Sequence, residues 1–151
     1  MKGEFRRVSA SALTEDAGMP AGWFAISWRW IESKSERRRH HARWYKIAST
    51  HGTVYRILRF GGALEVDIRN AQGQIAIDWP AWLALSGYAE SPNEPLRLTI
   101  EPASKWRFWS LAVSHPDPAN QLAGKVALLS LGLGILSAIL AVWALQKAYW
   151  P

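Results

Sequence analysis

The 151-residue chain contains no cysteine. This absence excludes disulfide bonds, thiol catalysis and zinc or iron–sulfur sites that use cysteine ligands. The phosphate-loop pattern GxxxxGK[ST], the zinc pattern HExxH and the serine-nucleophile pattern GxSxG are also absent. The four histidines form no ligand pattern: His40 and His41 are adjacent, His51 lies in an expected turn, and His115 precedes a proline. We therefore expect a non-catalytic protein without cofactor or metal.

The N-terminal segment, residues 1–21, lacks a continuous apolar stretch. A secretory signal needs such a stretch, so we expect this segment to be a basic arm and the N-terminal domain to stay in the cytosol. Across the chain, 18 Lys and Arg residues against 12 Asp and Glu residues give a formal net charge of +6. A basic surplus favours anionic partners such as lipid head groups, nucleic acid or acidic proteins.

The C-terminal part carries the long apolar run that the N-terminal segment lacks. Residues 126–145 contain no charged side chain. A helix of that length spans about 30 Å, which matches the hydrocarbon core of a bilayer. We predict a transmembrane helix over residues 125–147 and a short tail over residues 148–151. Basic and aromatic residues suited to the membrane interface lie at its two edges: Lys125, Trp143, Lys147, Tyr149 and Trp150.

Small residues recur within this apolar run. Ser130, Gly134 and Ala138 are four residues apart, and Ser137 and Ala141 lie beside them. Such a stripe forms a shallow groove that lets a second helix approach closely. We expect the groove to pack against another membrane protein or a second copy of the chain. The alternative is that these small residues are ordinary components of a membrane helix.

Residues 22–114 are predicted to form a β-domain. Apolar and polar residues alternate in most of this region, as in antiparallel strands with one buried face. The sequence predicts a small antiparallel sandwich or barrel of about seven strands with one short helix, so the fold class is all-β. A linker over residues 115–124, which contains two prolines, is expected to join this domain to the transmembrane helix.

Two local signals within the β-domain are specific. The run WYKIASTHGTVYRILRF predicts a hairpin whose two-residue turn is His51–Gly52, with Gly52 at positive φ. The run DWPAWLALSG predicts the short helix, with Asp78 as its N-cap and Gly87 as its C-terminal cap.

The densest positive charge lies between residues 34 and 46, where we expect a loop between strands. We expect this loop to bind anionic lipid or an acidic subunit, because arginine pairs with phosphate and carboxylate. Nucleic acid is less favoured, since few aromatic residues accompany the charge. The alternative is an ordinary solvated loop. The basic residues are Lys34, Arg37, Arg38, Arg39, Arg43 and Lys46.

A second basic and aromatic segment precedes the predicted linker. It contains Lys105, Trp106, Arg107 and Trp109. We expect a last strand or a ribbon at the membrane surface, with these side chains at head-group depth.

One pair of carboxylates is a candidate active-site feature. Glu65 and Asp78 face each other if the two strands that contain them pair across a turn at residues 70–73. A metal ion or a shared proton would stabilise such a pair and would indicate an active site. The alternative is an arginine from a neighbouring strand. Three arginines are available for that role: Arg56, Arg59 and Arg97.

These features together favour a tail-anchored accessory, assembly or adaptor subunit of an inner-membrane complex, with its C-terminus outside. A bacterial host is expected, because 12 arginines against 6 lysines and many Ala and Trp residues are typical of a GC-rich genome. One alternative is a homo-oligomeric effector that perturbs the membrane when its β-domain senses a ligand. The other is a membrane-anchored binder of nucleic acid or anionic lipid that uses residues 37–39.

Overall fold

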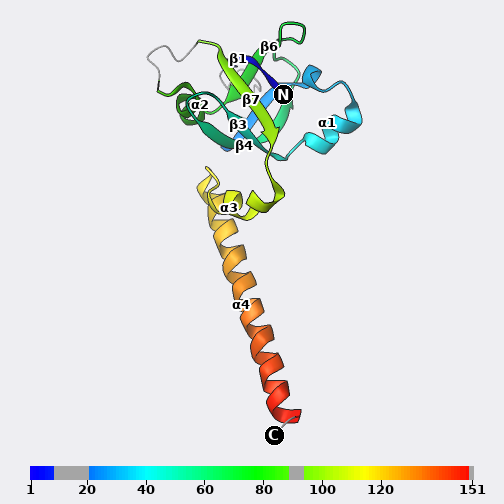
Figure 1. The fold of residues 1–151 in the computed structure, drawn as a ribbon, viewed down its shortest axis with the longest axis vertical. Coiled ribbons are helices and arrows are strands. Elements are labelled where there is room, and N and C mark those ends of the chain that lie inside the picture. The colour runs from blue at the N-terminus through cyan, green and yellow to red at the C-terminus, as the bar shows by residue number, and fades with distance from the viewer. Residues whose placement is uncertain (9–20, 89–93, 150–151) are drawn as a thin grey trace. The chain divides into compact units, whose positions relative to one another are not determined.

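The computed structural model describes residues 1–8, 21–88 and 94–149 (Figure 1). The chain forms two units, which are described separately below: Met1–Phe108, named the barrel unit, and Trp109–Pro151, named the tail unit.

Six strands of the barrel unit close into a barrel in the order β1-β7-β3-β4-β2-β6, with β6 pairing back to β1. A seventh, β5, pairs with the start of β6. The prediction of a small all-β barrel of about seven strands is therefore confirmed. Two pairings, β1–β6 and β2–β4, are parallel, which the alternation pattern did not indicate. The strands are β1 (Lys2–Val8), β2 (Trp23–Ser27), β3 (Trp44–Ala48), β4 (Thr53–Gly61), β5 (Val66–Asp67), β6 (Gln72–Ile77) and β7 (Leu96–Pro102).

The described residues also contain helical segments between and after the strands. In the view of Figure 1, α1 and α2 lie on different sides of the barrel. The segments are the 3-10 turns η2 (Trp28–Trp30) and η3 (Lys105–Arg107), and the helices α1 (Lys34–His40), α2 (Trp79–Ser86), α3 (Phe108–Val113) and α4 (Pro118–Tyr149).

The barrel interior holds the larger of two apolar clusters, and the smaller one contains Ala25, Leu64 and Ala76. Alternate residues of the strands point inward, as expected for strands with one buried face, and α2 adds three side chains to the same core. The largest contribution from α2 is Trp82, which is fully buried. The core residues are Phe5, Phe24, Ile26, Tyr45, Ile47, Leu58, Ile75, Ile77, Ala81, Trp82, Leu85, Leu98 and Ile100.

The N-terminal segment differs from the expected basic arm. Lys2–Val8 forms β1, which pairs with β6 on one side and β7 on the other. Phe5 is fully buried in the core, whereas Arg6 is exposed. A strand with one large inward-facing side chain among glycine and charged residues gives almost no apolar periodicity, so the sequence pattern did not reveal it.

The predicted hairpin of β3 and β4 is present, but its turn lies one residue earlier than expected. Ala48 pairs with Thr53, and Ser49 N–H donates to the Gly52 carbonyl at 2.9 Å. Gly52 does not have positive φ. A Cβ at Gly52 would lie 2.4 Å from the Ala84 carbonyl oxygen of α2, so a close approach between the turn and α2 requires glycine there.

Helix α2 begins and ends as the sequence predicted. The Asp78 side chain accepts from Ala81 N–H at 3.2 Å, which satisfies one of the free N–H groups of the first turn. Gly87 ends the helix in the left-handed conformation, with φ of 68°.

Two segments expected as loop or strand are helical. Residues 34–40 form α1, none of whose residues is buried, so no apolar stripe in the sequence signalled a helix. Residues 105–113 form η3 and α3 instead of a last strand or ribbon. Over so short a stretch, the basic and aromatic residues fit both the two-residue period of a strand and the 3.6-residue period of a helix. The strand interpretation was wrong.

The tail unit contains α4, which includes the predicted transmembrane segment and begins earlier, at Pro118, within the expected linker. Within Pro118–Lys147, the most apolar 18-residue window has a mean hydropathy of 2.3, and no part of that window is buried. This helix is long and apolar enough to span a membrane.

Candidate functional site

The predicted basic cluster divides into one structural arginine and several exposed basic side chains. Arg37 Nη1 donates to the carbonyls of Ile31 at 2.9 Å and Glu32 at 3.0 Å. Its guanidinium also lies 5.0 Å from the ring centroid of Trp28. Arg37 therefore fixes α1 to the chain that precedes it.

The remaining basic residues of the cluster are more accessible. Lys34, Arg38, Arg39 and Arg43 are exposed, the first three on α1 and the last just before β3. Lys46 is half-buried on β3, where it pairs with Tyr55 on one side and Glu101 on the other. The cluster is thus ordered by α1 and the start of β3, not displayed on a loop.

A hydrogen bond connects the C-terminal end of α1 to the barrel core. The Tyr45 hydroxyl and His40 Nδ1 share this bond, and the Tyr45 ring is buried against Phe24. Burial, which outweighs the nearby positive charge of Arg43, raises the pKa of the Tyr45 hydroxyl, so it stays protonated at neutral pH. Nothing in the sequence indicated the hydrogen bond between Tyr45 and His40.

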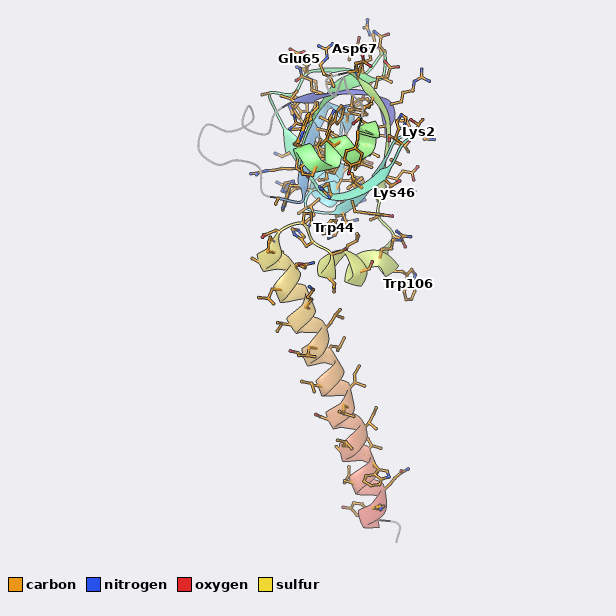
Figure 2. The ribbon with its side chains drawn as sticks, turned by 90° about the vertical axis from the view of Figure 1, so that its left-hand side faces the viewer. Lys2, Trp44, Lys46, Glu65, Asp67 and Trp106 are labelled. Atoms are coloured by element: carbon orange, nitrogen blue, oxygen red, sulfur yellow. The ribbon has the colours of Figure 1, made fainter. Side chains whose placement is uncertain are left out.

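The segment around Trp106 is helical and its indole is the most exposed large apolar side chain of the barrel unit, at 93%. The adjacent Arg107 is held by the barrel: its Nη1 donates to the Tyr55 hydroxyl at 2.6 Å, and its guanidinium lies 5.5 Å from the Tyr55 ring centroid. Figure 2 shows Trp106 directed away from the barrel. Lys105 belongs to η3 and Trp109 to α3.

Glu65 and Asp78 do not form the carboxylate pair. Val66 pairs with Gly73, so the hairpin register places Glu65 beside Gln74, whose Nε2 donates to Glu65 Oε2 at 3.2 Å. Asp78 is bound by Arg56 in bidentate fashion, at 2.6 and 2.8 Å. The two-carboxylate hypothesis is therefore wrong, and the arginine alternative holds for Asp78.

The pKa of the Asp78 carboxyl reflects this arrangement. Burial tends to raise that pKa, but the hydrogen bonds and charge of Arg56, together with the Ala81 N–H, outweigh burial and hold the pKa below its ordinary value. Asp78 is therefore ionised at neutral pH and acts as a cap and ion-pair partner.

Arg7 and Trp79 form a contact that sequence reasoning missed. The Arg7 guanidinium lies 4.8 Å from the ring centroid of Trp79, and its Nε donates to the Ile77 carbonyl at 3.2 Å. The two residues are 72 positions apart in the sequence and meet because β1 pairs with β6. The sequence pattern could not indicate the contact without β1.

The tail residues predicted for helix packing and for the interface lie along α4. The helix-packing candidates are all exposed: Ser130, Gly134, Ser137, Ala138 and Ala141. A Cβ added at Gly134 would have no atom within 4 Å. Trp150 lies outside the described residues. The interface candidates on α4 are all exposed: Lys125, Trp143, Tyr149 and Lys147, whose Nζ lies 4.6 Å from the ring centroid of Trp143.

Among the described residues no group of three or more His, Asp or Glu side chains could hold a metal ion. No known family model matches the chain, and no curated protein is significantly similar to it.

Proposed function

We propose that this chain is a single-pass, tail-anchored membrane protein whose barrel unit acts as an accessory, assembly or adaptor subunit of a membrane complex. The observation that carries the proposal is α4. Its apolar window has no buried part within the chain. Burying a helix of this hydropathy in a bilayer removes its apolar surface from water. The barrel unit already has an apolar core of its own.

The charges next to α4 support an orientation with the barrel unit in the cytoplasm. Lys105, Arg107 and Lys125 precede the apolar run, and Lys147 follows it. Basic residues near the ends of a membrane helix are retained on the cytoplasmic side more often than on the other. A bacterial inner membrane is the host membrane we propose.

The small-residue stripe supports association with a partner helix. Ser130, Gly134 and Ala138 lie on one face at helical spacing, where small side chains allow close backbone approach. An adaptor needs such a second contact because one anchor alone only fixes it to lipid.

The test compares the tagged full chain with Gly134→Ile and Gly132→Ile in pull-downs from native membranes in mild detergent. Gly132 lies off the stripe, and a Cβ added there, as at Gly134, would have no atom within 4 Å. Both changes add the same apolar volume and preserve insertion. We expect a stoichiometric membrane protein to accompany wild type and Gly132→Ile and to be lost from Gly134→Ile. Recovery of the chain in the soluble fraction would overturn membrane anchoring.

Self-association without another protein would overturn the adaptor role. The effector hypothesis would then be favoured, with the same groove joining two copies. The effector hypothesis also requires that overexpression of the chain is toxic. Gly134→Ile should abolish that toxicity, and Gly132→Ile should retain it.

A further inference from the structure

The barrel unit exposes one indole far more than a folded domain normally does. Trp106 is 93% exposed, while Trp28 and Trp79 are 42% and 41% exposed and each contacts an arginine. An indole combines a large apolar surface with a polar N–H, which is why tryptophan concentrates at the boundary between lipid head groups and hydrocarbon. An indole left in water forgoes the stabilisation that burial would give it.

Trp106 is presented by an ordered segment. After β7 ends at Pro102, Ala103 N–H donates to the Trp44 carbonyl at 2.9 Å, and Arg107 N–H donates to the Ser104 carbonyl at 3.0 Å. The bond from Arg107 to Tyr55 then ties η3 to β4. These contacts hold the backbone on both sides of Trp106, so a surface that binds the indole also orients the barrel.

The same end of the barrel carries α1 and its exposed basic residues. Residues 41–43 lead from α1 into the start of β3, and Tyr45 of β3 pairs with Pro102 at the end of β7. A shallow groove is lined by α1 through Glu36 and by the barrel through Pro102, which brings α1 beside the start of the Trp106 segment. We name this region, with Trp106, the basic end. Its exposed basic side chains are Lys34, Arg38, Arg39, Arg43 and Arg107.

The charge of the barrel unit is unevenly distributed. On the side of the barrel away from Trp44 and Trp106, the exposed acidic residues Glu65 and Asp67 are accompanied by exposed basic residues, Arg6 and Arg69 (Figure 2). At the basic end, the five exposed basic side chains outnumber the acidic Glu32, Glu36 and Glu101. Near a negative membrane surface each basic residue contributes about 1 kcal/mol of attraction.

We propose that the basic end docks on an anionic bilayer surface, with Trp106 inserted at head-group depth and the arginines on lipid phosphates. The proposal rests on the proposed membrane anchoring by α4. Chain length supports it. The first eight residues of α4, before the charge-free run, rise about 12 Å, α3 adds about 9 Å, and residues 114–117 between them add at most about 14 Å. Trp106 is thus tethered within about 35 Å of the charge-free run, and a tethered contact needs little affinity of its own to form.

The test uses the cysteine-free chain, because a single introduced cysteine can be labelled without interference. The full chain carries an environment-sensitive fluorophore on Ser104→Cys, beside Trp106, or on Thr50→Cys, at the β3–β4 turn as a control. Both residues are exposed. Each protein is reconstituted into vesicles of phosphatidylcholine alone or mixed with phosphatidylserine. Resistance to alkaline extraction reports insertion of α4 independently of the label.

We expect the Ser104 label, and not the Thr50 label, to be quenched by a lipid-borne quencher in the mixed vesicles. Quenching should be lost in phosphatidylcholine alone and at about 1 M salt, where the screening length falls to about 3 Å. Trp106→Ser and the double change Arg38→Ser with Arg39→Ser should each abolish it. Tyr88→Ser, which removes another exposed aromatic side chain, should not.

Other outcomes separate this inference from the proposed function. An inserted chain whose Ser104 label stays accessible to a water-soluble quencher in both lipids would overturn docking and leave anchoring intact. Equal lipid quenching in both lipids would overturn the role of anionic charge. Shielding from both quenchers would indicate contact with a second copy and overturn lipid docking. Extraction of the chain by alkali would overturn both proposals.

Discussion

Asp78 carries two roles at one position, because it caps α2 and binds Arg56. The Arg56 side chain is only 12% exposed, so its guanidinium needs this partner to offset the hydration lost on burial. We expect Asp78→Ala to lower the free energy of unfolding by about 2–3 kcal/mol, the sum of a lost cap and a partly buried arginine left unpaired. Urea unfolding monitored by circular dichroism measures this loss. The matched control is Glu65→Ala, which removes an exposed carboxylate and should change stability by less than about 0.5 kcal/mol.

The same carboxylate gives a pH dependence whose sign is fixed. Because the pKa of Asp78 is lower in the folded chain than the unfolded value of about 3.9, its contribution is fully present above pH 4. That contribution is lost as the pH falls through the folded-state pKa. The stability difference between wild type and Asp78→Asn should therefore shrink as the solution is acidified below pH 4. A difference that stays constant from neutral pH to the acid limit would contradict the ion pair.

At the scale of elements, α1 illustrates how one basic residue differs from its neighbours. Arg37 holds α1 through two carbonyls and the Trp28 ring, whereas Arg38 is exposed. We expect Arg37→Ala to destabilise the barrel unit by about 1–2 kcal/mol and Arg38→Ala to leave its stability unchanged. Hydrogen exchange of the α1 amides should rise in the first variant alone. Equal exchange in both variants would show that Arg37 is as dispensable as Arg38.

Elements with a strong local signal were predictable from the sequence. Helix α2 has an N-cap, an early proline and a C-terminal glycine within ten residues, and all three act locally. The hairpin of β3 and β4 also follows from local alternation, although its turn shifted by one residue. The turn also makes a contact outside the hairpin, between Gly52 and the Ala84 carbonyl of α2, which no local pattern contains.

Elements defined by distant partners were not predictable. Strand β1 has one buried aromatic residue, Phe5, and its place follows from pairing with β6 and β7 far along the chain. The Glu65–Asp78 hypothesis failed because it placed the four-residue turn at residues 70–73, whereas Asp67 pairs with Gln72 and the turn lies at residues 68–71. In the candidate site, the positive charge was visible in the sequence. That Arg37 has a structural role while other arginines stay exposed was not, because it depends on the contacts of Arg37 with Trp28 and with backbone carbonyls.

At the scale of the whole molecule, the two units differ in what stabilises them. The barrel unit keeps its entire core cluster between Phe5 and Ile100, so we expect its stability not to require the tail. Helix α4 has the opposite character, because its apolar window is exposed along its whole length and needs lipid or detergent.

Residues 1–108 produced alone should therefore be soluble without detergent and should unfold in one cooperative transition, as small domains with one core do. Their free energy of unfolding should match that of the barrel unit in the full chain, measured in detergent, within about 1 kcal/mol, because every residue of the barrel's core cluster is kept. Phe5→Ala in the shortened chain should cost about 3–5 kcal/mol, since it opens a cavity where β1 closes the barrel. Aggregation of residues 1–108, or a transition without cooperativity, would mean that the barrel depends on the tail unit for its fold.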